Sequence, residues 1–481
     1  MNAMQTTERK SLGKLGWGLV LAALLLGVLW DQWVFRHLFQ QQGYFYWSLY
    51  WMAYLVLFYA LNWQAAKGSR MGWALAALAV VLSLRSLFYA QNAMAFLTTL
   101  AIPAVLMLHA QVASGAAGED RDGLFALLYL EGWFVQPFRA IGKFFTTLGG
   151  LMKPEKSSTS RQVLLGFIIA LPVVAIVGFL LVGADGVMAY YMQAMLQNFD
   201  LPWLFWHGLG IFIATLLFFS FLYEQRLGPR DRRLKQPVQT YWNPITVSVL
   251  LGILLALYAL FTYVQFAYLF GQGGLPAGMT YAGYARSGFM QLMLVAILNL
   301  TVFGLCLRYT HPSPAIRGLL MGLLAATAVI LASSFTRLGM YIGAYGLTWM
   351  RLLPFSFLVA LSVLVLLSAL RIWLPKLRLL RVGAAVLVIW FLALGFGNPE
   401  ALIARVNLSR YEAGQKVSME YLMELSSDAV GALVRHAQAS PSADLEQVLR
   451  VHRNRLQSKT YMTLSDRLAR RRLDAYFQTH P

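Results

Sequence analysis

Residues 346–381 read GLTWMRLLPFSFLVALSVLVLLSALRIWLPKLRLLR, a long apolar run that ends among four basic residues with no acid near them. A hydrocarbon core about 30 Å thick requires roughly 20 apolar residues in a helix, and this run is long enough. Basic residues directly after such a run are typical of a cytoplasmic loop. The stretch therefore predicts a transmembrane helix followed by an inner loop.

Apolar runs of similar length alternate with short connecting segments through most of the 481 residues. The chain is 59% hydrophobic and 12% charged, against roughly 25% charged residues in a soluble domain. We predict an all-α fold, a polytopic membrane helical bundle with about eleven transmembrane helices. The predicted spans are residues 14–30, 45–62, 72–89, 91–110, 162–183, 203–223, 244–269, 287–308, 316–337, 346–370 and 380–397.

Basic residues predict the orientation of the bundle. The segment before the first span and every second connection after it are basic, and together they hold 22 Lys and Arg. The connections on the other side of the membrane hold Arg36, Arg286 and Arg337. The positive-inside rule then gives a cytoplasmic N-terminus, and an odd number of spans gives an extracytoplasmic C-terminus. Residues 1–30 have no small-residue cleavage site and predict an uncleaved first helix rather than a signal peptide.

Composition divides the chain into four predicted parts. They are the first four transmembrane helices (1–110), a cytoplasmic loop (111–161), seven transmembrane helices (162–397) and a small helical extracytoplasmic domain (398–481). The loop mixes aromatic and basic residues, which is typical of an amphipathic helix in the headgroup layer; a helix packed under the bundle is the alternative. The last part predicts four or five short helices, one with a capping box of Thr463 and Asp466.

Several function classes are disfavoured. The net charge of +19 is spread over short loops rather than gathered in one stripe, so nucleic acid is not an expected partner. Cys306 is the lone cysteine, which excludes an intrachain disulfide. No Asp or Glu lies between Arg232 and Pro399, and metal sites and acid–base chemistry need such groups close together. We therefore predict no metal and no cofactor.

Arginines at the outer ends of spans are the candidates for a binding site. An arginine deep in a membrane helix costs about 2.5–3.5 kcal/mol or more to insert, so it is usually paired, snorkels to the interface or faces a water-filled site. Here hydroxyl and amide side chains accompany the arginines without a carboxylate, a lining that suits an anionic ligand. Snorkelling arginines and polar bonds that merely hold helices together are the alternative. The ligand-binding candidates are Arg85, Tyr258, Thr262, Gln265, Thr280, Tyr281, Tyr284, Arg286, Asn299, Ser333, Arg337, Tyr341 and Arg351.

One carboxylate supports a different hypothesis. Asp31 closes the first span, in a loop that also holds Arg36 and His37. Multi-span, polyprenyl-linked glycosyltransferases carry an acidic residue in that loop, but the loop here is too short for the helices those enzymes place there. Asp31 is thus either an ordinary interfacial acid or the catalytic residue of a transferase. His207 is expected to be a hydrogen-bonded histidine rather than a metal ligand.

Three segments resemble a bacterial family of polytopic membrane proteins known only as a domain of unknown function. They are GLPAGMTYAGYARSGFMQLMLVAILNL (274–300), LLVGADGVM (180–188), and NPEALIARVNLSRY (398–411) followed by SMEYLMELSSDAVGAL (418–433). The chain departs from the pattern at Met188, where an aromatic residue is common, and at Ser287, where a second Arg is frequent. The resemblance implies a bacterial cytoplasmic membrane and no established activity. The positions that carry the resemblance are Thr280, Tyr281, Tyr284, Ala285, Arg286, Gly288, Phe289, Asn407, Arg410 and Tyr411.

These observations lead to three hypotheses. The first is a non-enzymatic, multi-pass protein of the bacterial inner membrane that binds or transports an anionic amphiphile or solute through an outer-facing, arginine-lined cavity. The second is a polyprenyl-phosphate-dependent glycosyl or phosphoryl transferase that uses Asp31. The third is a sensor or scaffold subunit that acts through its external tail and inner loop. The expected partners are the lipid bilayer, an anionic lipid or lipid-linked ligand, and an envelope protein at the C-terminal domain.

Overall fold

The computed structural model describes residues 2–37, 43–115, 124–151, 201–228, 241–265, 288–311 and 313–480, with isolated positions between 174 and 186. Within these residues the regular structure is helical, which confirms the all-α prediction. Nine helices of the described ranges are long and apolar enough to cross a membrane, so the chain is a multi-pass membrane protein. Most of the predicted span 162–183 lies outside the described residues.

Ten helices coincide with ten of the predicted spans. The helix α2 is as long as a span but is not among the nine, because its Tyr and Trp residues lower its mean hydropathy. The helix α14 continues beyond the predicted end at Arg337 as far as Gly346, whose φ of 79° ends it. The ten are α1 (Asn2–Leu29), α2 (Gly43–Ala66), α3 (Arg70–Phe88), α4 (Asn92–Ala113), α10 (Leu201–Leu227), α11 (Pro244–Gln265), α13 (Phe289–Tyr309), α14 (Pro314–Tyr345), α15 (Trp349–Trp373) and α16 (Leu379–Phe396).

The chain divides into two compact units. Unit 1 comprises Met1–Leu87 and Ala95–Arg233, and unit 2 comprises Phe88–Met94 and Leu234–Pro481. The turn between α3 and α4 therefore belongs to unit 2, although most of both helices belongs to unit 1. The chain leaves unit 1 and returns to it within one interhelical connection.

Close packing of α1 against α10 organises unit 1. A Cβ atom on Gly27 would come within 2.7 Å of the backbone oxygen of Ile211, so only glycine permits this approach. Beyond Gly27, α1 continues as a π-helical turn, Trp30–Val34, and a 3₁₀ turn, Phe35–His37. Buried Tyr and Phe side chains of α2 fill the adjoining core.

The predicted cytoplasmic loop forms three short helices in unit 1: α5 (Leu124–Phe134), α6 (Gln136–Arg139) and α7 (Ile141–Leu151). Gln136 of α6 faces the spans, since the side-chain amides of Gln111 and Gln225 both donate to its Oε1, at 2.9 and 2.7 Å. Phe134 of α5, in contrast, is 71% exposed. The packing supports a helix docked on the bundle, and the exposed aromatic side supports contact with lipid.

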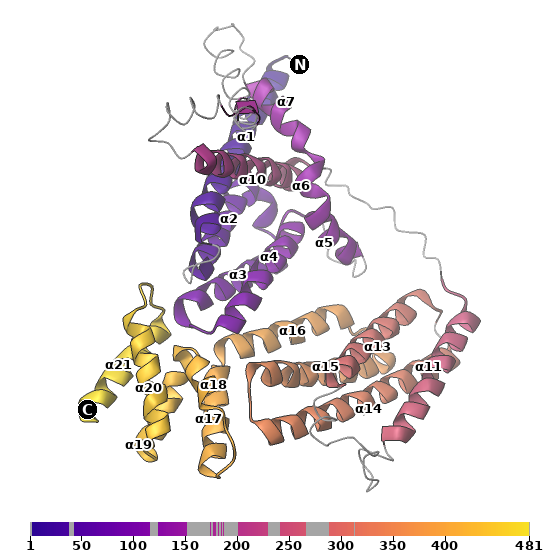
Figure 1. The fold of residues 1–481 in the computed structure, drawn as a ribbon. Helices are drawn as coiled ribbons and strands as arrows, with labels where there is room; N and C mark the ends of the chain where they lie inside the picture. The colour runs from indigo at the N-terminus through magenta and orange to yellow at the C-terminus, as the bar shows by residue number, and fades with distance from the viewer. Residues whose placement is uncertain are drawn as a thin grey trace. The chain divides into compact units, whose positions relative to one another are not determined.

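In unit 2, α11 and α13–α16 form a bundle, and five further helices form a domain with its own apolar core (Figure 1). The count agrees with the prediction of four or five, and the capping box of Thr463 and Asp466 is confirmed. The helices are α17 (Pro399–Glu412), α18 (Met419–Glu424), α19 (Val430–Ala439), α20 (Ala443–Gln457) and α21 (Leu464–Thr479). We call residues 398–480 the C-terminal domain.

Candidate functional site

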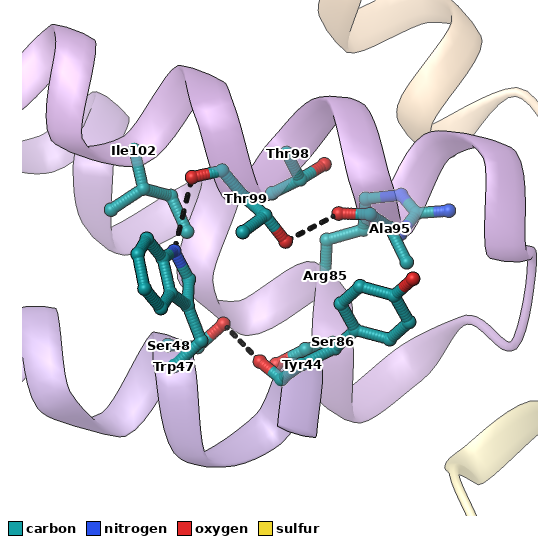
Figure 2. Close-up of a pocket in the computed structure, with 9 residues that line it drawn as sticks. All are labelled: Tyr44, Trp47, Ser48, Arg85, Ser86, Ala95, Thr98, Thr99 and Ile102. Carbon is teal, nitrogen blue, oxygen red and sulfur yellow. Dashed lines mark hydrogen bonds between the residues drawn. The ribbon is translucent and has the colours of Figure 1, made fainter. Parts of the chain in front are cut away.

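A small hollow in unit 1 surrounds Arg85, one of the predicted site residues. It holds about 200 Å³ of space, part of it open to solvent. Arg85 lies in the last turn of α3, where a cation is favoured by the helix dipole, and is 1% exposed. Figure 2 shows the surrounding side chains, which come from three helices. We call this site the Arg85 hollow; its lining consists of Tyr44, Trp47 and Ser48 of α2, Arg85 and Ser86 of α3, and Ala95, Thr98, Thr99 and Ile102 of α4.

Three hydroxyl groups of the hollow donate hydrogen bonds to the backbone. Ser48 donates to the Tyr44 carbonyl at 3.0 Å, and Thr99 donates to the Ala95 carbonyl at 2.9 Å. The Ser86 hydroxyl likewise donates to a carbonyl of its own helix, at 2.8 Å. These oxygens present lone pairs rather than protons to a ligand in the hollow. Arg85 is the one charged side chain among the residues that line the hollow.

Size and charge together limit what the hollow can bind. Most of its space is open, and the enclosed part has room for only about one water-sized group, so the hollow suits only a small group at its open side. A guanidinium binds carboxylate and phosphate oxygens in a bidentate manner. The chemistry of Arg85 therefore suits a phosphate or carboxylate oxygen that reaches it from the open side.

A second predicted arginine, Arg337 on α14, lies in unit 2. It is 9% exposed, and its Nη1 would be 2.6 Å from a Cβ atom on Gly288. Gly288 has a φ of 85°, a left-handed conformation that favours glycine, and it precedes α13. Ser333, one turn before Arg337, is fully buried. The guanidinium thus packs against the start of α13.

Arg351 binds the end of a helix. Its Nη1 donates to the carbonyl oxygens of Tyr345 and Gly346 at 2.9 and 2.6 Å, where α14 ends. The guanidinium also stacks on the ring of Tyr341, 4.2 Å from the centroid. These contacts support a structural role for Arg351 and Tyr341 as the C-terminal cap of α14.

Tyr258 and Asn299 take part in a buried network between helices of unit 2. The Tyr258 hydroxyl donates to Asn299 Oδ1 at 2.7 Å, and Asn299 Nδ2 donates to Thr327 Oγ1 at 3.0 Å. The network joins α11, α13 and α14, as expected for polar bonds that hold a membrane bundle together. Thr262 lies one turn further along α11 than Tyr258, and Gln265 is its last residue.

Four predicted site residues, Thr280, Tyr281, Tyr284 and Arg286, lie outside the described residues.

Asp31 has a histidine partner. The Asp31 carboxylate is 1% exposed and contacts Nδ1 of His207, on α10, through Oδ1. Its other oxygen accepts a hydrogen bond from Gln32 Nε2 at 3.0 Å and lies 4.0 Å from Arg36 Nε. Trp203 packs on the imidazole, with ring centroids 4.3 Å apart. The expected hydrogen-bonded histidine is thus found, and its partner is the acid that closes the first span.

Comparison with known families assigns the chain. A family model described as "Domain of unknown function (DUF4153)" matches residues 73–436, about three quarters of the sequence. The chain belongs to the DUF4153 family. No curated protein and no solved structure matches it. The membership confirms the resemblance and brings no activity with it.

Motif residues of this DUF4153 chain dock the C-terminal domain on the bundle. The side-chain amide of Asn407 bonds both backbone groups of Leu347, in the turn between α14 and α15. Arg410 donates to the carbonyl oxygens of Gly343 and Ala344 at 2.7 and 3.3 Å. Tyr411 turns the other way and donates to Asp444 at 3.0 Å. The motif therefore covers the same helix end that Arg351 caps.

A second docking contact of unit 2 lies at the turn Phe88–Met94. Asp428 accepts hydrogen bonds from the backbone amides of Ala90 and Gln91, both at 3.2 Å, and is 5% exposed. The Tyr89 hydroxyl donates to the Phe396 carbonyl at 3.0 Å. The C-terminal domain thus holds the connection between α3 and α4.

Glu400 is a third buried anchor of the C-terminal domain. Burial raises its pKa, although hydrogen bonds from Ser426 and from Trp349 Nε1 oppose the rise. A buried carboxylate with a raised pKa can mark a functional site. Here its partners are the start of α15 and the segment before Asp428, so it serves the same docking.

Sequence reasoning missed the residues that line the hollow with Arg85, and one buried histidine. Tyr44, Trp47 and Ser48 recur at helical spacing on α2, a signal that would have placed them on one face. His109 of α4 is fully buried and bonds the Tyr59 hydroxyl at 3.1 Å.

Proposed function

We propose that this DUF4153 protein binds an anionic amphiphile or solute, through a phosphate or carboxylate group, in the Arg85 hollow. The protein would act without chemistry, in a bacterial inner membrane, with the hollow toward the outer side.

One observation carries the proposal: the buried Arg85 lines a hollow that is partly open to solvent. Placing a charged arginine in a membrane helix costs about 2.5–3.5 kcal/mol or more, and such residues commonly mark functional sites. Ser48, Ser86 and Thr99 line the same hollow, and their hydroxyl groups give their protons to the backbone.

The test compares the lipids and small anions that co-purify with the gently solubilised protein. We expect an anionic amphiphile on the wild type and its loss from Arg85→Ala, with partial retention in Arg85→Lys, which keeps the charge but not the fork. Arg317→Ala removes an exposed arginine of unit 2 and serves as the matched control for bulk attraction of anionic lipid. Equal retention in Arg85→Ala and Arg317→Ala would contradict the proposal.

The Asp31–His207 contact favours one second candidate, the lipid-phosphate-dependent transferase. A carboxylate bonded to one imidazole nitrogen leaves the other nitrogen to take or give a proton. In this role Asp31 positions His207, and Asp31→Asn abolishes transfer while leaving anion binding at Arg85 unchanged. Loss of both transfer and anion binding in Asp31→Asn would contradict a transferase site separate from the Arg85 hollow.

A further inference from the structure

The turn that connects the two helices on either side of Arg85 is built into the second unit. Ser86 and Ala95 both line the Arg85 hollow, and the chain passes into unit 2 at Phe88 and out of it at Met94. Any movement of the ends of α3 and α4 therefore moves the turn itself, without an intervening segment.

Direct hydrogen bonds attach this turn to the C-terminal domain. Asp428 accepts the amides of Ala90 and Gln91, and Asn398 Nδ2 donates to the carbonyl of Asp428 at 3.0 Å. Gln91 is fully buried. Bonds from backbone amides to a buried carboxylate are charge-assisted and stronger than neutral ones, so the turn and the residue before α17 move with Asp428.

The contact with Asp428 reaches the rest of the domain through a short path. Ser426 and Ser427, directly before Asp428, bond Glu400 of α17 and Asp466 of α21 respectively. Asp466 in turn pairs with Lys459 at 2.7 Å. A shift of the turn is thus felt at the starts of two helices of the domain.

We infer that the C-terminal domain is a sensor of the Arg85 hollow. Binding of a phosphate or carboxylate group to Arg85 draws the ends of α3 and α4 together, and the turn Phe88–Met94 transmits the change to Asp428. The inference rests on the proposed anion binding and adds a second function to it, reporting occupancy to the helical domain. Because coupling is reciprocal, loosening the turn from Asp428 weakens anion binding by the same factor by which the anion tightens the contact.

The experiment uses the full chain in phosphatidylcholine nanodiscs and follows hydrogen exchange in the peptide that contains Ala90 and Gln91. Two probes separate the sources of the anion: inorganic phosphate in solution, and nanodiscs that contain phosphatidylglycerol. We expect the active probe to slow exchange of these amides and of residues 426–428. In Asp428→Asn the slowing disappears and the apparent Kd of the probe rises, within the roughly 5- to 150-fold range typical of allosteric coupling.

Two further variants keep the result decisive. Glu420→Gln makes the same charge change at an exposed acid of the domain and leaves binding and exchange unchanged. Tyr89→Phe removes the other bond of the turn, to Phe396, and reproduces part of the Asp428→Asn effect even if that variant folds poorly.

The outcomes distinguish the two claims. If neither probe binds, or if Arg85→Ala binds it as well as the wild type does, the proposed function is wrong and the sensor falls with it. If Arg85→Ala abolishes binding but exchange of the turn is unaffected by the probe, or Asp428→Asn and Tyr89→Phe bind and exchange like the wild type, the sensor is wrong while the binding site stands.

Discussion

The side-chain amide of Asn407, on α17, forms two hydrogen bonds with the backbone of Leu347. The Leu347 amide donates to Asn407 Oδ1 at 2.9 Å, and Asn407 Nδ2 donates to the Leu347 carbonyl at 2.7 Å. Both residues are buried, and Gly346 leaves room for the contact, since a Cβ there would come 2.4 Å from Asn407 Oδ1. The pair fixes the C-terminal domain to the turn between α14 and α15.

Asn407→Ala is expected to loosen this domain. The substitution leaves two buried backbone groups without partners, at a cost of about 1–3 kcal/mol for each. Thermal unfolding of the full chain and protease sensitivity of residues 398–480 measure the effect. Asn454→Ala, at an exposed position on α20, is the control, and equal behaviour of the two variants would show that the pair does not hold the domain.

Acid is expected to weaken the C-terminal domain through His452. Burial lowers the pKa of this histidine from 6.5 to about 4, and its Nε2 donates to the Leu422 carbonyl at 3.0 Å. The folded state therefore binds fewer protons than the unfolded state between these pH values, and stability falls as the pH falls from 6.5 to 4, by about 3 kcal/mol at most. Unfolding followed across this range tests the sign. His452→Gln, which does not titrate, should flatten the profile; an unchanged slope would assign the acid sensitivity elsewhere.

Glu400 is expected to act in the opposite direction. Because burial raises its pKa above the ordinary 4.5, the folded state holds the proton more tightly than the unfolded state does. Its contribution to stability is greatest below pH 4.5 and decreases as the pH rises through the folded-state pKa. Comparing the pH dependence of unfolding in wild type and Glu400→Gln measures this contribution. A variant that loses more stability than the wild type at rising pH would contradict the assignment.

Asn299 separates two interpretations of the polar side chains in the spans. If the Tyr258–Asn299–Thr327 network only joins helices, Asn299→Ala lowers stability by about 1 kcal/mol and leaves anion binding unchanged. Thr301→Ala, at an exposed hydroxyl of the same helix that bonds its own backbone, is the control. A loss of binding in Asn299→Ala without a loss of stability would return the residue to the binding site.

Hydropathy predicted where the helices lie in the sequence, but not which helices contact one another. Apolar runs of span length predicted α3, α4, α10, α11, α13, α15 and α16 within a few residues, because helix formation in a membrane depends on local sequence. The predicted end of α14 was wrong. An arginine after an apolar run is typical of the end of a span, but Arg337 is buried inside the helix. What ends the helix is the conformation of Gly346.

The candidate site was predictable only in part. Arg85 is recognisable as a charge at the end of a span, but the residues around it come from α2 and α4, and nothing local in the sequence brings them together. The bond between Asp428 and Ala90 joins residues 338 positions apart. Arg351 shows the converse, because an arginine accompanied by hydroxyl side chains fitted a binding site equally well until its carbonyl partners were known.

The central claim is that Arg85 binds an anionic headgroup. The most direct test is a titration of phosphatidylglycerol against phosphatidylcholine by native mass spectrometry on the wild type, Arg85→Ala and Arg317→Ala. A charge-assisted hydrogen bond contributes about 1.5–3 kcal/mol, or roughly tenfold to a hundredfold in affinity. We predict that Arg85→Ala raises the Kd of the tightest phosphatidylglycerol by that factor, while Arg317→Ala leaves it unchanged. Identical titrations for all three proteins would contradict the account.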